Sequence, residues 1–262
     1  MVEISIVIPT LKPRDEIEAV QCLERGTFED FEVIVRDDVP VTRARNEGIK
    51  RASADKLVFL DDDSCPTRNY LQLASEILDR EAAFAGRTIH PRDDVFARHF
   101  TGHYDWGDSP QYVQRFWGNN MGARRDVFDA VGGWDENMGW GHEEKELANR
   151  VIQKFDIRYH PDLVVYHPYA ESVTDYWRKL YKLETQTPYL WHKYGYSTGD
   201  QLRQVVSNSL NPRKYVRRGV LPTVVQTGAR ISRTAGQLRG ILDANGGRDE
   251  SIPQLDHRSE KT

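Results

Sequence analysis

Three adjacent aspartates, Asp61, Asp62 and Asp63, are the residues whose type and position most clearly predict chemistry in this sequence. They directly follow the apolar run Lys56–Leu60, so we expect them at the end of a buried strand. Neighbouring carboxylates repel one another unless a cation offsets their charge. Mg²⁺ or Mn²⁺ does so with oxygen ligands, and it also bridges diphosphate oxygens. A solvated acidic loop is the alternative, but the position directly after a strand argues against it.

Two further features indicate a functional site only if they lie close to the acidic loop. Glu143 and Glu144 follow a glycine-rich turn and begin a predicted helix. Acidic residues at that position either are stabilised by the helix dipole alone or supply a general base. His167 follows the apolar run Leu163–Tyr166. It is a surface or packed histidine unless that strand ends near Asp63, in which case it completes a metal site.

The elements that must position these residues alternate between strand and helix. Such alternation predicts an α/β fold with a doubly wound, mostly parallel sheet, in which ligands bind at the carboxyl ends of the strands. Through Asp79, the predicted strands are Ile4–Thr10, Phe31–Val35 and Lys56–Leu60, and the predicted helices are Asp15–Glu24, Thr42–Ala52 and Asn69–Asp79.

The second half of the chain has a less regular pattern. Residues 90–117 are rich in aromatics and histidine, and no element is assigned to them. Beyond them we expect helices at Arg125–Val131 and Glu143–Gln153, two strands at Ile157–Tyr159 and Leu163–Tyr166 joined by a Pro161-Asp162 turn, and one long helix at Glu171–Tyr194.

Taken in order, these segments resemble glycosyltransferase family 2, whose members have the GT-A fold. Each match is weak alone, but their order along about residues 3–169 is specific. The matching segments are SIVIPT at Ser5–Thr10, FEVIVRDD at Phe31–Asp38, ARNEGI at Ala44–Ile49, LDDDSCP at Leu60–Pro66, NMGARR at Asn120–Arg125, GGWDE at Gly132–Glu136, GHEEKEL at Gly141–Leu147 and VYHP at Val165–Pro168.

The resemblance implies an inverting transfer of sugar from a nucleotide diphosphate sugar, with UDP-sugar as the expected donor, to a hydroxyl of a glycan or lipid-linked glycan. It assigns Mn²⁺ or Mg²⁺ to Asp61, Asp63 and His167, and general-base catalysis to Glu144, with Glu143 as a rival. It also implies a donor pocket formed by Pro9, Thr10, Asp38, Arg45, Asp61 and Asp62, and acceptor contacts from Trp134, Trp140 and Asn120. The two tryptophans could equally be core aromatics.

Two other functions compete with this interpretation. A sugar nucleotidyltransferase also combines a doubly wound sheet with metal-bound acids, but it carries a glycine-rich phosphate loop after the first strand. The corresponding loop here, Leu11–Asp15, has no glycine. A catalytically inactive carbohydrate-binding or scaffold protein would keep the fold but lose Asp63 or the acid that begins the helix, and both are present.

Length and composition suit a globular protein: 262 residues, 39% hydrophobic and 29% charged. We expect a GT-A domain at 1–195, a basic amphipathic helical tail at 196–244 and a disordered segment at 245–262. Two isolated cysteines, Cys22 and Cys65, do not suggest a disulfide framework. With no visible secretory signal, they predict a cytoplasmic protein.

The tail has an unusual charge pattern, because 201–242 contains no Asp or Glu although the whole chain has a net charge of −4. Its apolar residues recur every three or four positions, which is typical of an interfacial helix on an anionic membrane. Packing on the catalytic domain and a dimer contact are the alternatives, and the acidic remainder of the chain argues against nucleic acid. The basic residues are Arg203, Arg213, Lys214, Arg217, Arg218, Arg230, Arg233 and Arg239; the apolar ones are Leu221, Val224, Val225, Ile231, Ala235, Leu238 and Leu242.

Overall fold

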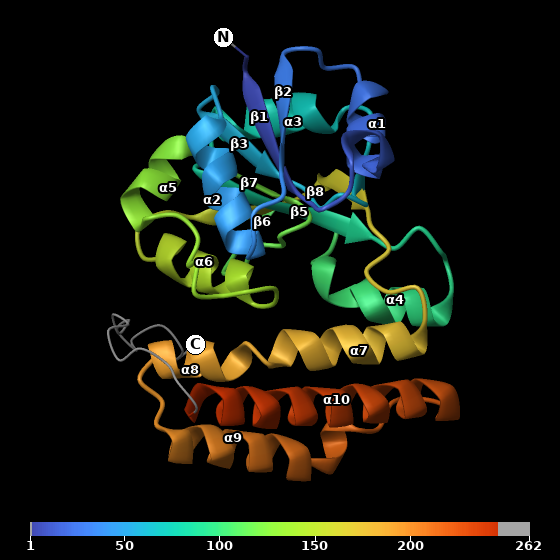
Figure 1. Ribbon diagram of the computed structural model, residues 1–262. Coiled ribbons are helices and arrows are strands. Elements are labelled where there is room, and N and C mark those ends of the chain that lie inside the picture. The colour runs from blue at the N-terminus through green and yellow to red at the C-terminus, as the bar shows by residue number, and fades with distance from the viewer. Residues whose placement is uncertain (1, 246–262) are drawn as a thin grey trace. The chain divides into compact units, whose positions relative to one another are not determined.

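The computed structural model describes residues 2–245 as two compact units (Figure 1). The first, called here the sheet unit, comprises Met1–Gly139 and Glu143–Tyr169. The second, the helical unit, comprises Trp140–His142 and the chain from Ala170 onward. The predicted boundary at residue 196 therefore lies within the helical unit. The predicted disordered segment lies almost entirely outside the described residues.

The sheet unit contains one mixed sheet in the order β2-β1-β3-β7-β5-β8-β4, with β6 paired to β8. The longest pairings are parallel, β1 with β2 and β5 with β8, which confirms the predicted largely parallel α/β fold. The strands are β1 (Ile4–Pro9), β2 (Phe31–Arg36), β3 (Lys56–Phe59), β4 (Cys65–Pro66), β5 (Ala83–Ile89), β6 (Gln111–Val113), β7 (Met121–Arg124) and β8 (Ile157–Tyr166).

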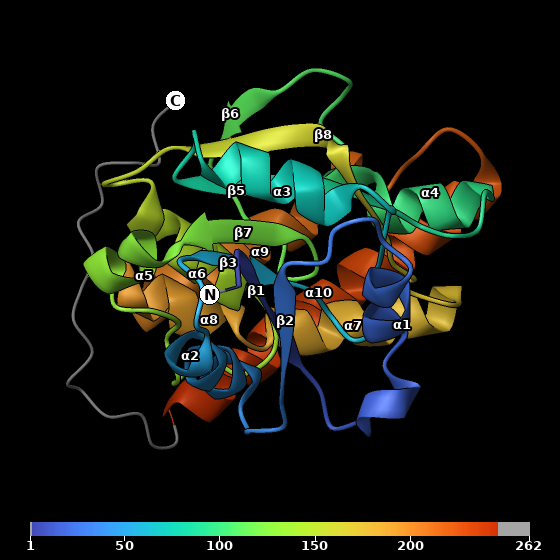
Figure 2. The same ribbon diagram turned by 90° about the horizontal axis from the view of Figure 1, so that it is seen from above.

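Helices cover both faces of this sheet (Figure 2). Ile4, Ile6 and Ile8 of β1 pack against α1 and α3, whereas Val7 faces the cluster that contains α2, α5 and α6. Alternate side chains of one strand thus enter two separate cores, as a doubly wound sheet requires. The helices are α1 (Glu18–Glu24), α2 (Val41–Arg51), α3 (Tyr70–Leu78), α4 (Val95–Thr101), α5 (Arg125–Val131) and α6 (Glu143–Val151), with short 3₁₀ turns η1 (Arg14–Glu16) and η2 (Gly102–Tyr104).

Two predicted elements are wrong in detail. The strands expected on either side of Pro161-Asp162 form one strand, β8, because the proline is accommodated by a register shift: His160 pairs with Gly86, and Val164 with Arg87. The long helix expected at Glu171–Tyr194 is divided into α7 (Val173–Glu184) and α8 (Thr187–Lys193). Pro188 stands in the first turn of α8, where a proline is tolerated, but it cannot continue the preceding helix.

The helical unit also contains α9 (Thr198–Leu210), the 3₁₀ turn η3 (Pro212–Lys214) and α10 (Val220–Asn245). Glycines on α10 let α7 approach closely. A Cβ at Gly236, for example, would lie 2.3 Å from the carbonyl oxygen of Tyr181. Among the described residues, no helix is both long and apolar enough to cross a membrane.

A buried carboxylate, Glu184, lies where these helices meet. It accepts hydrogen bonds from Arg233 (2.6 Å), Gln237 (2.7 Å) and Thr187 (2.7 Å). Its burial favours the neutral acid, but the hydrogen bond and charge of His142 and the charge of Arg233 outweigh it. They hold the pKa of Glu184 well below its ordinary value.

Candidate functional site

The three aspartates lie at the carboxyl edge of the sheet. Asp61–Asp63 leave β3 and lead into β4, which pairs with the last residues of β8. Because β1, β3 and β8 run in the same direction, Thr10, the aspartates and His167 all follow the carboxyl ends of strands. This is the edge at which open α/β sheets bind ligands, and the predicted position of the acidic loop is correct.

His167 faces two of these carboxylates. Its Nε2 lies 3.0 Å from Oδ1 of Asp63 and 3.6 Å from Oδ2 of Asp61, and only 9% of its side chain is exposed. Burial favours the neutral form of Asp63, but the hydrogen bond and charge of His167 outweigh it and lower the pKa of Asp63. Burial raises the pKa of Asp61 despite the opposing charges of His167 and Arg45. Two carboxylates and an imidazole that face one another offer oxygen and nitrogen donors to a divalent cation.

Arg45 connects the acidic loop to the start of α6. Its side chain is 3% exposed, with Nη1 2.8 Å from Oε1 of Glu143 and Nη2 3.5 Å from Oδ1 of Asp61. Its guanidinium lies over the ring of Trp134, 4.5 Å from the centroid. A buried arginine held between two acids fixes both in place, because breaking either pair would leave an uncompensated charge.

The first two residues of α6 have different environments. Glu143 is 4% exposed and accepts the hydrogen bond from Arg45, whereas Glu144 is half-buried. Burial and then the charge of Glu143 raise the pKa of Glu144 to about 8. The residue before them, His142, has a left-handed φ of 64°, which is uncommon for a residue with a side chain.

Residues 40–132 match the family model described as Glycosyl transferase family 2. Over this range the chain is similar to family 2 glycosyltransferases. The matched range holds Arg45 and the three aspartates. Glu143 and His167 lie beyond it, but the fold brings them into contact with Arg45 and Asp63, respectively. No curated protein matches the chain.

Among solved structures, S. aureus TarS is similar to this chain, with a TM-score of 0.51 and 12% sequence identity. The match covers 93% of this chain but only 55% of TarS. At that identity the similarity establishes the fold, and it agrees with the GT-A architecture predicted from the sequence.

Several predicted donor-pocket residues of the sheet unit contact one another. Thr10 donates its hydroxyl hydrogen to Asp62, and Nζ of Lys12 lies 3.0 Å from the other oxygen of that carboxylate. The sequence patterns did not single out Lys12, although its place just after β1 puts it at the ligand edge. Asp38 accepts a 2.8 Å hydrogen bond from Arg36, a second cation that the sequence patterns did not single out.

Of the predicted acceptor residues, two are buried in the sheet unit. Asn120 has no exposed surface and bonds to Tyr70 and to the carbonyl oxygens of Arg87 and Leu163. Trp134 is 3% exposed and packs edge-on to Phe59. Neither side chain is available to a sugar, so we correct both assignments to structural roles.

Trp140 differs from those two. It is half-buried and belongs to the helical unit, where Nζ of Lys182 lies 5.2 Å from its ring centroid. An acceptor role for Trp140 stays a prediction.

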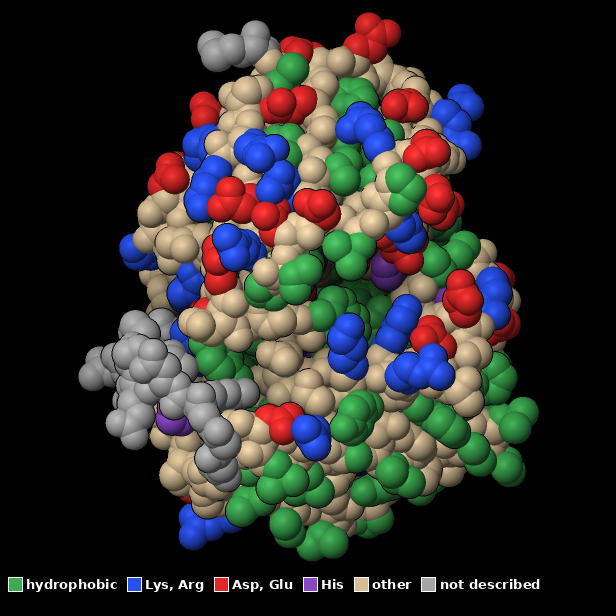
Figure 3. Space-filling view, in the orientation of Figure 1, with side chains coloured by type: hydrophobic (Ala, Val, Ile, Leu, Met, Phe, Trp, Pro, Cys, Tyr) green, Lys and Arg blue, Asp and Glu red, His purple; other side chains and the backbone are tan. Residues whose placement is uncertain are grey.

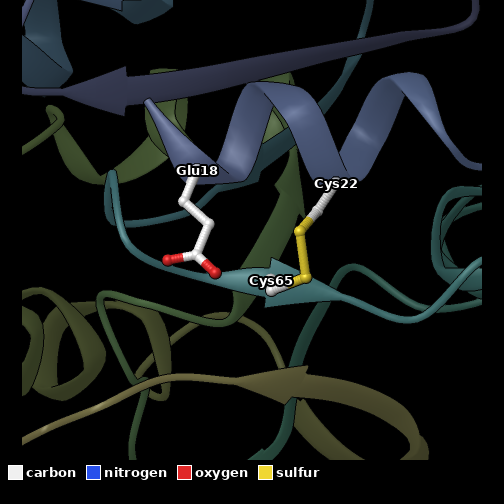
Figure 4. A group of neighbouring side chains, drawn as sticks. All are labelled: Glu18, Cys22 and Cys65. Atoms are coloured by element: carbon white, nitrogen blue, oxygen red, sulfur yellow. A yellow bond between two sulfur atoms is a disulfide. The ribbon is translucent and has the colours of Figure 1, made fainter. Parts of the chain in front are cut away.

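The two cysteines overturn another expectation, because Cys22 of α1 and Cys65 of β4 form a disulfide (Figure 4). They are 43 positions apart in sequence, but α1 packs beside β4, a proximity that a cysteine count does not reveal. The argument for a reducing compartment therefore no longer holds. The amide of Ala19 also donates to the carbonyl oxygen of Asp62, so α1 holds the acidic loop at two points.

Glu18 lies beside this disulfide, and the three side chains form the one group of three or more potential ligand atoms within 4.8 Å among the described residues. The sulfurs of the two cysteines are bonded to each other and are not free thiolates, so this group does not resemble a metal centre. Asp61, Asp63 and His167 are less tightly gathered, but all three keep available donor atoms.

Proposed function

We propose that this chain transfers a sugar from a nucleotide diphosphate sugar, with a UDP-sugar as the expected donor, to an acceptor hydroxyl. The observation that carries the proposal is the Arg45 bridge. Arg45 contacts both Asp61 and Glu143. Asp61 faces His167, and Glu143 directly precedes Glu144, whose pKa is raised. A site for an anionic leaving group and a site for a proton acceptor are thereby fixed relative to each other in the sheet unit.

The donor diphosphate would bind at Asp61, Asp63 and His167. Mn²⁺ or Mg²⁺ held there would offset the charge that develops on the leaving diphosphate. Lys12 and Thr10 restrain Asp62 at the neighbouring strand end, where it can accept hydrogen bonds from the donor. Asp38 and Arg36 lie after β2, which suits contacts with the nucleotide base.

Glu144 is the proposed base. It accepts the proton of the acceptor hydroxyl while that oxygen bonds to the anomeric carbon. The bond from this carbon to the diphosphate oxygen breaks, and the diphosphate leaves with the electron pair. The single displacement inverts the anomeric configuration. Glu143 is the weaker candidate, because Arg45 already occupies its carboxylate.

Thermal stabilisation by nucleoside diphosphates, each with and without Mn²⁺, tests the donor site. We expect one nucleotide to raise the melting temperature only when the metal is present, because a ligand that binds the folded state stabilises it by mass action. The rise should disappear in Asp63→Ala. No rise with any nucleotide at millimolar concentration would contradict the proposal.

The acceptor is proposed to be a glycan or a lipid-linked glycan. Products formed from each class by the intact chain, separated by mass spectrometry, would distinguish the two.

A further inference from the structure

Large apolar side chains are exposed in a cluster on the helical unit. They gather over α9 and α10 in Figure 3, and each is between 42% and 80% exposed. Together they are called the apolar strip: Leu202, Val206 and Leu210 on α9, Val216 in the connection, and Val220, Leu221, Val224, Ile231, Leu238 and Leu242 on α10. Contiguous exposed apolar surface of this kind marks a contact site more often than scattered single residues do.

The strip is a distinct face of α10. From Leu221 onward its members recur every three, four or seven positions, while Val225, Ala229 and Ile241 are buried within the helical unit. That side packs on α7, where Trp177 donates its indole N–H to the carbonyl oxygen of Val225. Side by side, α9 and α10 are joined by a 2.9 Å hydrogen bond between the hydroxyls of Ser209 and Thr234. The buried side of α10 therefore already packs within the helical unit, and the apolar strip is not part of that core.

Three exposed arginines lie at the corner where α9 connects to α10. Arg213, Arg217 and Arg218 alternate there with Leu210, Val216 and Val220. Within the part of the chain that the structure describes, none of the three arginines forms an ion pair, whereas Arg203, Arg233 and Arg239 are paired with acids. The corner therefore combines unpaired positive charge with the two most exposed large apolar side chains described in the helical unit, Leu210 and Val220.

We propose that the apolar strip and the three corner arginines form a docking surface for an anionic lipid bilayer. The apolar side chains would enter the interface between headgroups and acyl chains, and the arginines would remain among the anionic headgroups. A lipid surface thus offers an apolar phase to the apolar strip and anionic headgroups to the arginines.

A second copy of the chain fits this surface less well. A symmetric dimer would set the face against itself, and 201–242 contains no acid to pair with its arginines. Nucleic acid would satisfy the arginines but leave the apolar strip in water. Docking does not depend on the proposed sugar transfer, so the two proposals can fail separately.

Cosedimentation of the full chain with vesicles tests the surface. We expect binding to mixed phosphatidylcholine–phosphatidylserine vesicles, weak binding to phosphatidylcholine alone, and release at high salt. The triple variant Arg213→Gln/Arg217→Gln/Arg218→Gln should bind roughly a hundredfold more weakly, at roughly fivefold per arginine. The matched control Arg51→Gln/Arg80→Gln/Arg98→Gln removes the same charge from exposed positions of the sheet unit and should bind normally.

The apolar variant Val216→Ser/Val220→Ser/Leu221→Ser should also weaken binding while its melting temperature stays unchanged, because these residues are exposed. If the control triple lost vesicle binding to the same extent, net charge alone would explain the loss, and the proposal would be overturned. Absence of binding to anionic vesicles would also overturn it. A stable dimer that dissociates in Ile231→Gln would assign the strip to a second copy. Transfer to a water-soluble acceptor should be the same in the corner triple as in the unaltered chain, so the vesicle result is informative even if no transfer is found.

Discussion

The edge of the sheet and the outside of the helical unit depart from ordinary protein surfaces in opposite ways. At the sheet edge, ionisable groups are buried: Arg45, Glu143 and His167 are each less than a tenth exposed. On α9 and α10, leucine, valine and isoleucine are exposed instead. Proteins usually place charge outside and apolar groups inside, so each departure carries a cost that a function must explain. Buried charge suits fixed electrostatics for a reaction, and exposed apolar surface suits partition into another phase.

The replacement Glu144→Gln should cause the largest effect. Loss of a general base lowers the rate of transfer by about 10²- to 10⁴-fold. Initial rates measure it, while the metal-dependent thermal shift with nucleotide should stay. Glu143→Gln is the matched control. It should mainly reduce stability, because it leaves Arg45 buried beside a neutral partner. A larger loss of rate in Glu143→Gln than in Glu144→Gln would reverse the assignment.

Asp63→Ala should lower the rate by roughly 10²- to 10³-fold, comparable to the removal of one electrostatic contact from a transition state. The same variant should bind anionic vesicles as well as the unaltered chain. That result, paired with normal transfer in the corner triple, would separate the two regions functionally. If Asp63→Ala lost both properties, the variant would be misfolded or the comparison would be wrong.

The pH dependence of transfer should be steep below neutrality. Since Glu144 must be deprotonated to accept a proton and its pKa is raised to about 8, the rate should increase about tenfold per pH unit up to roughly pH 8 and then level off. Glu144→Gln should lose this dependence. A rate that is flat between about pH 6 and 8 in the unaltered chain would contradict the raised pKa.

Acid should weaken the helical unit by a smaller amount. The pKa of Glu184 is lower in the folded protein than its ordinary 4.5, so its contribution to stability is present above pH 4.5 and is lost as pH falls toward the folded value. The expected slope is at most about 1.4 kcal/mol per pH unit for one proton. Urea titrations over this range measure it, and Glu184→Gln should reduce the slope. An unchanged slope in that variant would place the acid-sensitive group elsewhere.

The sequence predicted the sheet and the acidic loop because their evidence is local. Apolar runs that end in Asp61–Asp63 and His167 define strand ends, and strand ends define the ligand edge. The base remained ambiguous, since Glu143 and Glu144 differ only in which one reaches Arg45, a contact between residues 98 positions apart.

The errors have the same origin in distant contacts. Trp134 and Asn120 look like ligand residues until the packing around them is known, because aromatic and amide side chains serve both in cores and in sites. The disulfide between Cys22 and Cys65 depends on the proximity of α1 to β4. The periodicity of α10 grouped Val225 with Leu221 and Val224, but Val225 is buried on the other side of the helix. Which side packs on α7 could not be read from the sequence.

The short segment Trp140–His142 bears on whether the chain can be truncated after the sheet unit. It interrupts the sheet unit, and within the helical unit Gly141 passes so close to α7 that an added Cβ would lie 2.8 Å from the Cα of Leu183. The chain thus passes from one unit to the other three times. A fragment that stops at Tyr169 would keep every described strand and Glu144, yet the three residues before α6 would lose their packing. Deletion of the C-terminal helices should therefore disturb the start of α6 even where no residue of the sheet unit is changed.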